Sequence, residues 1–194
     1  MEERVGVLYT EDDIRRRVRQ LGDAITRDYA GREPLLVSIL KGGIWFLSDL
    51  IKEIGLKARV DFMSITSYGG DSELTGGVVR ILKDLEQDIG GNDVIVVEDI
   101  VDTGLTLTYL LGALEARGPA SLEVCALLDK SVRRITPIEI RYRGFDCPDR
   151  FVVGYGLDFE ELYRNLPDIL AVDPQRLSDD PRALVHYVER NAGP

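Results

Sequence analysis

The sequence predicts an α/β protein built on a mostly parallel, twisted β-sheet flanked by helices. Two apolar runs, LLVSIL at 35–40 and VIVV at 94–97, have the length of short strands and lack polar alternation, which is typical of strands covered on both faces. Strand-like and helix-like segments alternate through the middle of the chain, and this order favours right-handed βαβ units. The 194 residues suffice for one domain with a sizeable core.

The first half of the chain begins with an amphipathic helix expected from about residue 11 to residue 29. Thr10 is its candidate N-cap, three acids occupy its first turn, and its apolar residues recur along one face. Pro34 then breaks the chain. The following pattern predicts a strand at 35–40, a helix at about 43–54 and a strand at about 57–64.

Residues 66–77, TSYGGDSELTGG, are rich in Gly, Ser and Thr and show no apolar periodicity, so they predict a mobile loop. The elements expected after this loop are strands at 78–82, 94–97, 122–128, 151–155 and 169–172, a turn at 90–93, and a helix at about 105–117. The polar tail that starts at Asp173 is expected to end in a short helix reaching about Asn191.

Composition argues against several classes of protein. The net charge of −10 disfavours non-specific binding to nucleic acid, because phosphate contacts demand clustered Lys and Arg. No apolar stretch approaches the roughly 20 residues of a membrane-spanning helix, and the charged first residues lack the apolar run of a secretory signal. Cys125 and Cys147 are expected to be reduced and structurally passive. We therefore expect a cytoplasmic protein that binds neither nucleic acid nor membrane.

The most informative segment is VIVVEDIVDTGLT at 94–106. It joins a buried strand to a helix start through a polar set: Glu98, Asp99, Asp102, Thr103, Gly104 and Thr106. Ligands of open α/β sheets lie beyond the carboxyl ends of strands, where hydroxyls, glycine and free helix N–H groups suit a phosphate. Three carboxylates there would repel a bare phosphate, but they suit a ligand that also carries hydroxyls and a divalent cation. A ribose phosphate with magnesium meets both conditions.

Two other interpretations of this segment are possible. The acids could cap the helix and Gly104 could form a tight turn, although capping needs one acid and not three. The Walker B strand of nucleotide hydrolases also ends in acids, but those enzymes need a GxxxxGK[ST] loop that this sequence lacks. The segment resembles the phosphoribosyl pyrophosphate motif of type I phosphoribosyltransferases. Leu105, which the resemblance includes among the residues that bind phosphoribosyl pyrophosphate, is a local departure, since many relatives carry a basic residue there.

Four further segments, in the family's order, resemble its hypoxanthine-guanine branch. The first is LKGG at 40–43, which in the family is a pyrophosphate loop with a cis peptide before the lysine. The resemblance thus implies pyrophosphate contacts from Lys41, Gly42 and Gly43 and a cis Leu40–Lys41 bond. The second is the loop at 66–77, where Ser67 and Tyr68 would cover the pyrophosphate as a lid that excludes water.

The other two segments would bind the purine. In LLDK at 127–130, Lys130 would donate to the exocyclic oxygen at purine position 6. In PDRFVVGYGLDFEELYRNLP at 148–167, the resemblance implies that Phe151 stacks on the base and Val152 offers backbone groups to its edge. In the same segment, Asp158 would bind magnesium beside the purine and Arg164 would contact pyrophosphate. Without the resemblance, Lys130 would be read as a surface residue and Phe151 as a core residue.

The resemblance also carries expectations for the whole molecule. It implies the type I phosphoribosyltransferase fold, with a core at about 35–150 and a small hood from the terminal segments, about 1–34 and 151–194. It implies Mg²⁺ as cofactor, with Glu98 and Asp99 holding the ribose hydroxyls and the metal, and Asp102 as general base. It also implies a homodimer or homotetramer. A xanthine-preferring or bifunctional transferase, or a nucleotide-sensing regulator of the same fold, stays open as an alternative.

Overall fold

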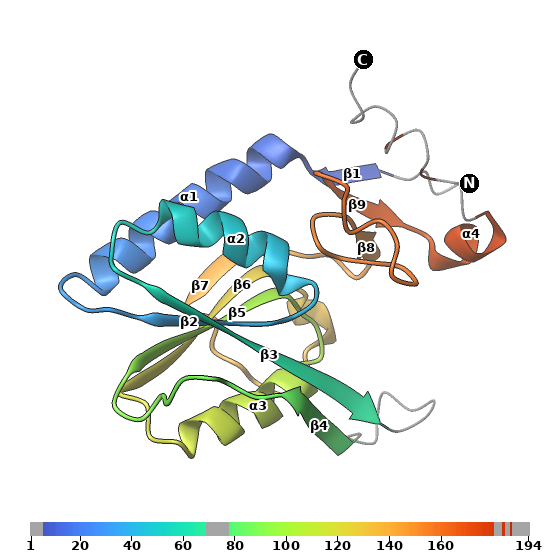
Figure 1. Ribbon diagram of the computed structural model, residues 1–194. Coiled ribbons are helices and arrows are strands. Elements are labelled where there is room, and N and C mark those ends of the chain that lie inside the picture. Colours follow the sequence, from blue (N-terminus) through green and yellow to red (C-terminus); the bar gives the residue numbers. More distant parts are fainter. Residues whose placement is uncertain (1–5, 69–77, 181–183, 185–186, 188–194) are drawn as a thin grey trace.

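The computed structural model describes residues 6–68, 78–180, 184 and 187, which form a larger and a smaller β-sheet (Figure 1). The larger sheet has six strands. In spatial order they are β4 (Val78–Lys83), β3 (Arg59–Tyr68), β2 (Leu35–Leu40), β5 (Asp93–Val101), β6 (Ser121–Asp129) and β7 (Tyr142–Asp146). Every neighbouring pair is parallel except β3 and β4. This is the predicted α/β class with a mostly parallel sheet.

Helices cover both faces of this sheet, as parallel strands require. In Figure 1, α1 (Glu11–Asp28) and α2 (Gly43–Glu53) lie on one face and α3 (Leu105–Glu115) lies on the other. The two inner strands β2 and β5 are therefore buried on both sides, with Leu36 paired to Ile95 in register. Burial on both faces explains why the sequences of these strands are apolar and do not alternate with polar residues.

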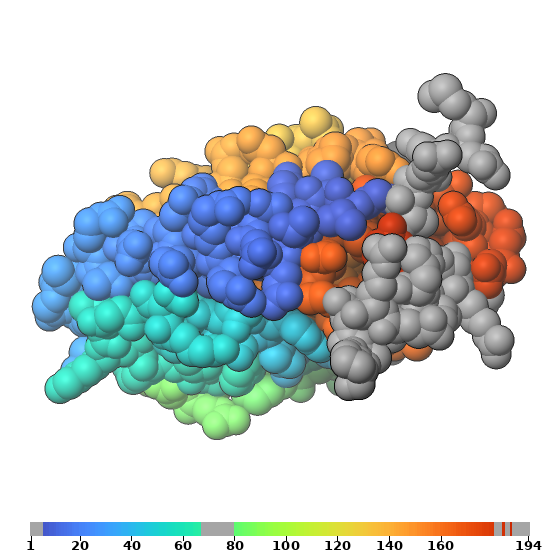
Figure 2. Space-filling view, turned by 90° about the horizontal axis from the view of Figure 1, so that it is seen from above, coloured from blue at the N-terminus to red at the C-terminus, as the bar shows by residue number. Residues whose placement is uncertain are grey.

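The first helix begins where its sequence predicts. Thr10 accepts a hydrogen bond from the Asp13 N–H, and the Asp13 side chain accepts from the Thr10 N–H, so the two form a capping box. The apolar face of α1 packs with α2 and the main sheet in one cluster. Viewed from above, α1 lies between α2 and the region of β7 (Figure 2). The expectation that residues 1–34 belong to the hood is therefore wrong for this helix.

The hood is a separate three-stranded antiparallel sheet in the order β1 (Gly6–Tyr9), β9 (Ile169–Val172) and β8 (Phe151–Val153). The short helix α4 (Pro174–Asp179) follows β9. From the N-terminal segment the hood takes only β1, and the rest comes from residues after 150. The strands expected at 151–155 and 169–172 both lie in this sheet, within the terminal segment 151–194 that was expected to form the hood.

Several element bounds differ from the sequence prediction. β3 continues to Tyr68 because it pairs with β4, so Ser67 and Tyr68 lie in a strand and not in a loop. β5 continues through both acids to Val101 because β6 pairs with it as far as Asp129. β8 ends at Val153, two residues early. β1 and β7 were not predicted, since GVLY and YRGFD are short and carry no clear alternation. The expected tail helix falls largely outside the described residues.

Within the described part of the chain, no helix is both long enough and apolar enough to cross a membrane. Both cysteines are buried and free, as expected.

Candidate functional site

A hollow of about 380 Å³ opens at the carboxyl ends of β2 and β5, the edge where α/β sheets bind ligands. It gathers predicted residues from three places along the chain. The loop after β2 gives Lys41 and Gly42; β5 and the start of α3 give Glu98, Asp99, Asp102, Thr103, Gly104 and Thr106; and the segment after β8 gives Asp158 and Arg164. Tertiary structure thus brings residues more than 100 positions apart to one site.

The turn between β5 and α3 is shaped to receive an anion. Gly104 is the N-cap of α3 and has a φ of 84°, a backbone conformation that favours glycine. The first N–H groups of α3 lie at the edge of the hollow, and they have no acceptor within the helix. Thr106 is exposed there, while Leu105 is half-buried and stands outside the lining of the hollow. The turn offers amides and hydroxyls, as the sequence predicted.

The loop after β2 passes against the acids of β5. Its Leu40–Lys41 peptide bond is cis, as the resemblance implied. A Cβ added to Gly42 would lie 1.7 Å from Asp99 Oδ2, so only glycine lets the loop approach this carboxylate. Gly43 begins α2 and lies outside the lining, with no room for a Cβ against Ser38 Oγ. Backbone and carboxylate therefore form one wall of the hollow.

The two adjacent acids in β5 are perturbed by their surroundings. Burial raises the pKa of Glu98 well above its ordinary value, and the neighbouring charge of Asp99 adds to the shift. Burial also raises the pKa of Asp99 to about 6, against the opposing effects of its backbone N–H donors and of Arg164. Asp158 raises the pKa of Asp99 further. Both shifts disfavour the ionised acids, and a nearby cation would oppose them by stabilising the ionised forms.

The three expected metal ligands do not form a cage by themselves. Among the described residues, no group of three or more His, Cys, Asp or Glu side chains is placed to hold a metal ion. Glu98, Asp99 and Asp158 thus do not form a three-carboxylate group, and their expected part in binding magnesium stays a prediction. Magnesium is nevertheless commonly bound by one or two carboxylates together with water and substrate phosphates. The oxygen donors of this hollow fit that mode.

Asp102 lies at the turn with one oxygen available. Its Oδ2 is 3.4 Å from Arg133 Nη1. Its Oδ1 is buried and has no hydrogen-bond partner among the residues that the structure describes. A buried polar atom without a partner is costly, so it marks a place where a ligand group would be accepted. A carboxylate oxygen in this position can receive a hydrogen bond or a proton.

Two cations face the acids across the hollow, and both are held by the segment after β8. Arg164 pairs with Asp158 at 2.7 Å and donates to the Gly156 carbonyl at 2.7 Å. Lys41 pairs with Glu161 at 2.8 Å, and both of these side chains are mostly exposed. The hood segment therefore contacts the loop after β2 through charged groups on the site.

Of the expected purine-binding residues, Asp158 lines the hollow, whereas Lys130, Phe151 and Val152 lie outside its lining. Lys130 is buried, its N–H donates to the Val101 carbonyl, and its Nζ donates to the Arg150 carbonyl at 2.9 Å. Phe151 is 37% exposed at the start of β8 and meets Phe159 edge-on. Val152 is paired within the hood sheet. Lys130 thus places a buried ammonium, and Phe151 an exposed ring, outside the lining of the hollow.

The lid residues are only partly placed. Ser67 and Tyr68 end β3 and pair in register with Val79 and Val78 of β4. The rest of the expected loop, residues 69–77, lies outside the described residues.

Sequence reasoning missed part of the site. Apolar side chains also line the hollow: Ile39, Leu40, Ile65, Ile100, Val101 and Leu107. The charged partners Glu161 and Arg133 were missed as well. Glu161 lies within the segment 148–167 that was singled out, so its acidic character near Asp158 was a usable signal. Arg133 had none, because only the fold brings it to Asp102.

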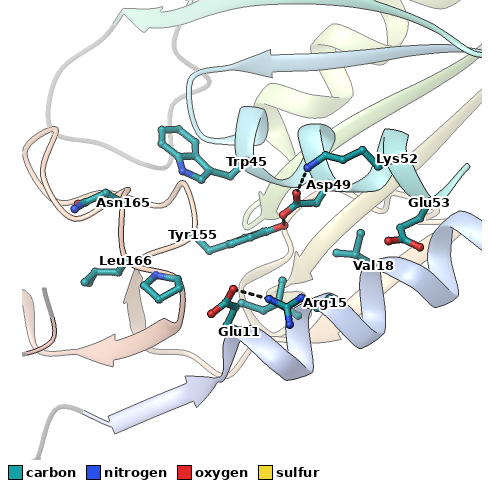
Figure 3. A pocket seen from close by; sticks show the side chains of 12 residues that line it. Glu11, Arg15, Val18, Trp45, Asp49, Lys52, Glu53, Tyr155, Asn165 and Leu166 are labelled. Carbon is teal, nitrogen blue, oxygen red and sulfur yellow. Dashed lines mark hydrogen bonds and ion pairs between the residues drawn. The ribbon is translucent and has the colours of Figure 1, made fainter. Parts of the chain in front are cut away.

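A second hollow, of about 420 Å³, lies between α1, α2 and the segment after β8 (Figure 3). Four of its charged side chains pair within the hollow, and Glu53 pairs with Arg19 outside the lining. Arg15 contacts Glu11 at 2.7 Å, and Asp49 accepts from both Lys52 and the Tyr155 hydroxyl. It contains neither the free helix N-terminus nor the strand-end acids of the first hollow. The first hollow is therefore the stronger candidate site.

Comparison with known proteins agrees with this geometry. The sequence profile of the phosphoribosyl transferase domain matches residues 6–160. A hypoxanthine-guanine phosphoribosyltransferase of Staphylococcus aureus is 48% identical over 173 residues, covering 89% of this chain and 96% of its own. That of Mycobacterium tuberculosis is 46% identical over 175 residues, covering 87% and 86%. A crystal structure of a hypoxanthine phosphoribosyltransferase from Staphylococcus aureus superposes with a TM-score of 0.85 at 48% identity, covering 88% of this chain and 92% of the other.

Proposed function

The chain belongs to the phosphoribosyltransferase family, and on that premise we propose that it joins hypoxanthine or guanine to 5-phosphoribosyl 1-pyrophosphate, releasing IMP or GMP and pyrophosphate. The relatives named hypoxanthine-guanine phosphoribosyltransferase are similar over more than four fifths of this chain, which supports this substrate pair. The type I phosphoribosyltransferase fold of the chain is that of these enzymes.

The single observation that carries the proposal is the convergence at the first hollow. The strand-end acids, the glycine turn at the start of α3, and two cations from separate segments surround one space of about 380 Å³. The turn from Thr103 to Thr106 would bind the 5′-phosphate through N–H and hydroxyl groups. Glu98 and Asp99 would accept hydrogen bonds from the ribose hydroxyls. Lys41 and Arg164 would neutralise the departing pyrophosphate.

Magnesium would enter with the activated sugar. Asp158, and indirectly Glu98 and Asp99, would hold it together with pyrophosphate oxygens, and the ion would supply charge neutralisation for the leaving group. Lys41 would leave Glu161, and Arg164 would turn from Asp158, to meet the pyrophosphate. Ser67 and Tyr68 would contribute to excluding water, since the reacting sugar has oxocarbenium character and water would capture it.

The base would be selected and deprotonated from the side of β6 and β8. Lys130 would donate to the oxygen at position 6, where adenine instead carries an amine. Phe151 would stack on the ring and Val152 would offer its backbone to the edge. As N9 bonds to C1 of the ribose and the bond from C1 to pyrophosphate breaks, Asp102 would take the proton from N7.

An initial-rate comparison tests this proposal. Hypoxanthine, guanine, xanthine and adenine are each supplied with the activated sugar, with and without Mg²⁺. We expect turnover of hypoxanthine and guanine, little or none of adenine, and loss of activity without the metal. Preferred use of xanthine would instead identify the xanthine-preferring alternative. No turnover of any base, with RNA retained in a filter-binding assay, would favour the regulator of the same fold.

We also propose that the enzyme works in the cytoplasm as a homodimer or homotetramer. The buried, unpaired state of Cys125 and Cys147 suits a reducing compartment. Sedimentation of the purified chain at several concentrations measures the assembly, and a monomer at all of them would remove that part of the proposal.

A further inference from the structure

The segment after β6 packs behind the turn that carries the proposed phosphate and base contacts. This segment begins with the short 3₁₀-helix η1 (Ser131–Arg133). The N–H of Ile135 donates to the Thr103 carbonyl at 2.9 Å. A Cβ added to Gly104 would lie 3.0 Å from Cδ of Arg134, so the arginine stem closes the space behind the glycine. The turn therefore has its shape supported from outside the hollow.

Arg134 links this turn to the end of β6. Its Nη2 donates to the carbonyl of Val101, the residue before Asp102, at 3.2 Å. The same nitrogen donates to Oδ1 of Asp129, and the two side chains are only 14% and 7% exposed. A second arginine, Arg143, places its Nε 3.4 Å from the other oxygen of Asp129. The buried guanidinium is thus compensated by charge on one side and bound to the turn on the other.

Arg134 does not touch the ligand space. It is absent from the described lining of the first hollow. Its Nε is buried and has no partner in the described part of the chain, so the contacts of Nη2 determine how the guanidinium is oriented. Any influence of Arg134 on the reaction would have to pass through the turn.

We propose that Arg134 is a positioning residue for the transferase reaction, fixing the turn from Asp102 to Thr106 by bridging Asp129 to the carbonyl of Val101. This inference rests on the proposed function, because that turn is assigned there to the 5′-phosphate and the base proton. A turn with a glycine in left-handed conformation has several accessible shapes. A displacement of about 1 Å in such a site can lower activity by about 100-fold.

The test compares two substitutions of Arg134. Arg134→Met keeps most of the stem and removes every donor. Arg134→Lys keeps a positive charge with three donors on a shorter side chain. We expect Arg134→Met to raise the KM for phosphoribosyl pyrophosphate and to lower kcat, by about 10- to 100-fold in kcat/KM. The KM for the purine should stay within about twofold, and Arg134→Lys should recover part of the loss.

Arg143→Met is the matched control. It removes the other arginine beside Asp129. The half-exposed Arg143 side chain pairs with Asp129 and Asp146 and, among the described residues, not with the turn. We expect wild-type kinetic constants for this control. Thermal unfolding of all variants, and calorimetric titration with phosphoribosyl pyrophosphate and Mg²⁺, separate positioning from loss of folded protein.

The outcomes are distinct. A variant that is merely less stable lowers the active fraction and leaves the KM for the activated sugar unchanged, and this result in both Arg134 variants would overturn the inference. An equal loss of kcat/KM in Arg143→Met would overturn the inference too, because the effect would then come from Asp129 losing a charge partner and not from the bond to Val101. If Arg134→Met does not fold, the sugar KM of Arg134→Lys decides, with an unchanged value counting against the inference. An inactive wild-type chain would instead refute the proposed function.

Discussion

At the scale of single residues, the site is a set of charges that are compensated in different ways. Lys41 and Arg164 are each bound to an acid of the segment after β8. Burial and the charge of Asp99 raise the pKa of Glu98, and burial raises the pKa of Asp99 against its N–H donors and Arg164. Asp102 alone of the site acids has an oxygen that is buried and without a partner among the described residues. These differences give each residue a separate test.

Asp102→Asn removes the proton acceptor and keeps the shape of the side chain. We expect kcat to fall by about 10²- to 10⁴-fold, the usual range for general acid–base catalysis. Binding of phosphoribosyl pyrophosphate should change far less, because the sugar is held by other groups. Steady-state kinetics and calorimetry measure the two quantities. Normal turnover in this variant would remove the general-base assignment.

Glu161→Gln frees Lys41 from its acidic partner. A hydrogen bond from Lys41 holds the pKa of Glu161 below its ordinary value, so Glu161 is a competing anion at neutral pH. Without this competitor, pyrophosphate should bind more tightly, with a Kd lower by up to about fivefold, since the pair is exposed and screened by solvent. Calorimetric titration measures the change. Glu160→Gln is the control that alters the same charge one residue away, and an equal effect there would show that the Lys41 contact is irrelevant.

At the scale of elements, β3 depends on a buried acid far from the hollow. Asp61 is 4% exposed and accepts N–H groups of Phe62, Glu86 and Gln87, which ties β3 to the connection before β5. Burial alone would raise the pKa of Asp61, but these three donors and Lys83 outweigh it and lower the pKa. The ionised form is therefore the one that stabilises the fold.

The lowered pKa of Asp61 sets the direction in which the stability of the fold changes with pH. A carboxyl whose pKa is lower in the folded state stabilises the fold above its unfolded pKa of about 3.9, and this contribution is lost as pH falls through the folded value. We expect Asp61→Asn to lower the free energy of unfolding at pH 7 by about 1–3 kcal/mol. The difference from wild type should shrink in acid below about pH 4. Denaturant unfolding at a series of pH values measures it, and a difference independent of pH would contradict the role of the charge.

At the scale of the whole molecule, the hollow lies where the main sheet meets the segment that leaves the hood. The two sheets share residues of one apolar cluster, in which Val152 and Ile169 of the hood pack with α1. The site is therefore complete only when both sheets are folded and joined. A ligand that binds the complete site alone will stabilise the whole fold.

Phosphoribosyl pyrophosphate with Mg²⁺ should accordingly raise the Tm. At a concentration of about 100 times its Kd, a ligand adds about 2.7 kcal/mol, which corresponds to roughly 5–10 °C for a chain of this size. The sugar with EDTA should give a much smaller shift, because the acids of the hollow would face the pyrophosphate without a cation. Differential scanning calorimetry measures both. Equal shifts with and without the metal would argue against magnesium entering with the sugar.

The sequence by itself determined the elements whose cause is local. Thr10 and Asp13 cap α1, the unalternating run of β2 requires burial on both faces, and Gly104 marks the turn at α3. The segment 94–106 also contained most of the residues proposed to bind the phosphate and the ribose, because neighbouring residues form that turn.

Only the tertiary structure decided which distant groups meet. The ends of β3 and β5 follow from pairing with β4 and β6, and α1 joins the main sheet because its apolar face packs there. No pattern in the sequence predicts the contact of Arg133 with Asp102 or that of Arg134 with Val101. Local propensity acts within a few residues, whereas these contacts depend on packing between elements that are distant in the chain.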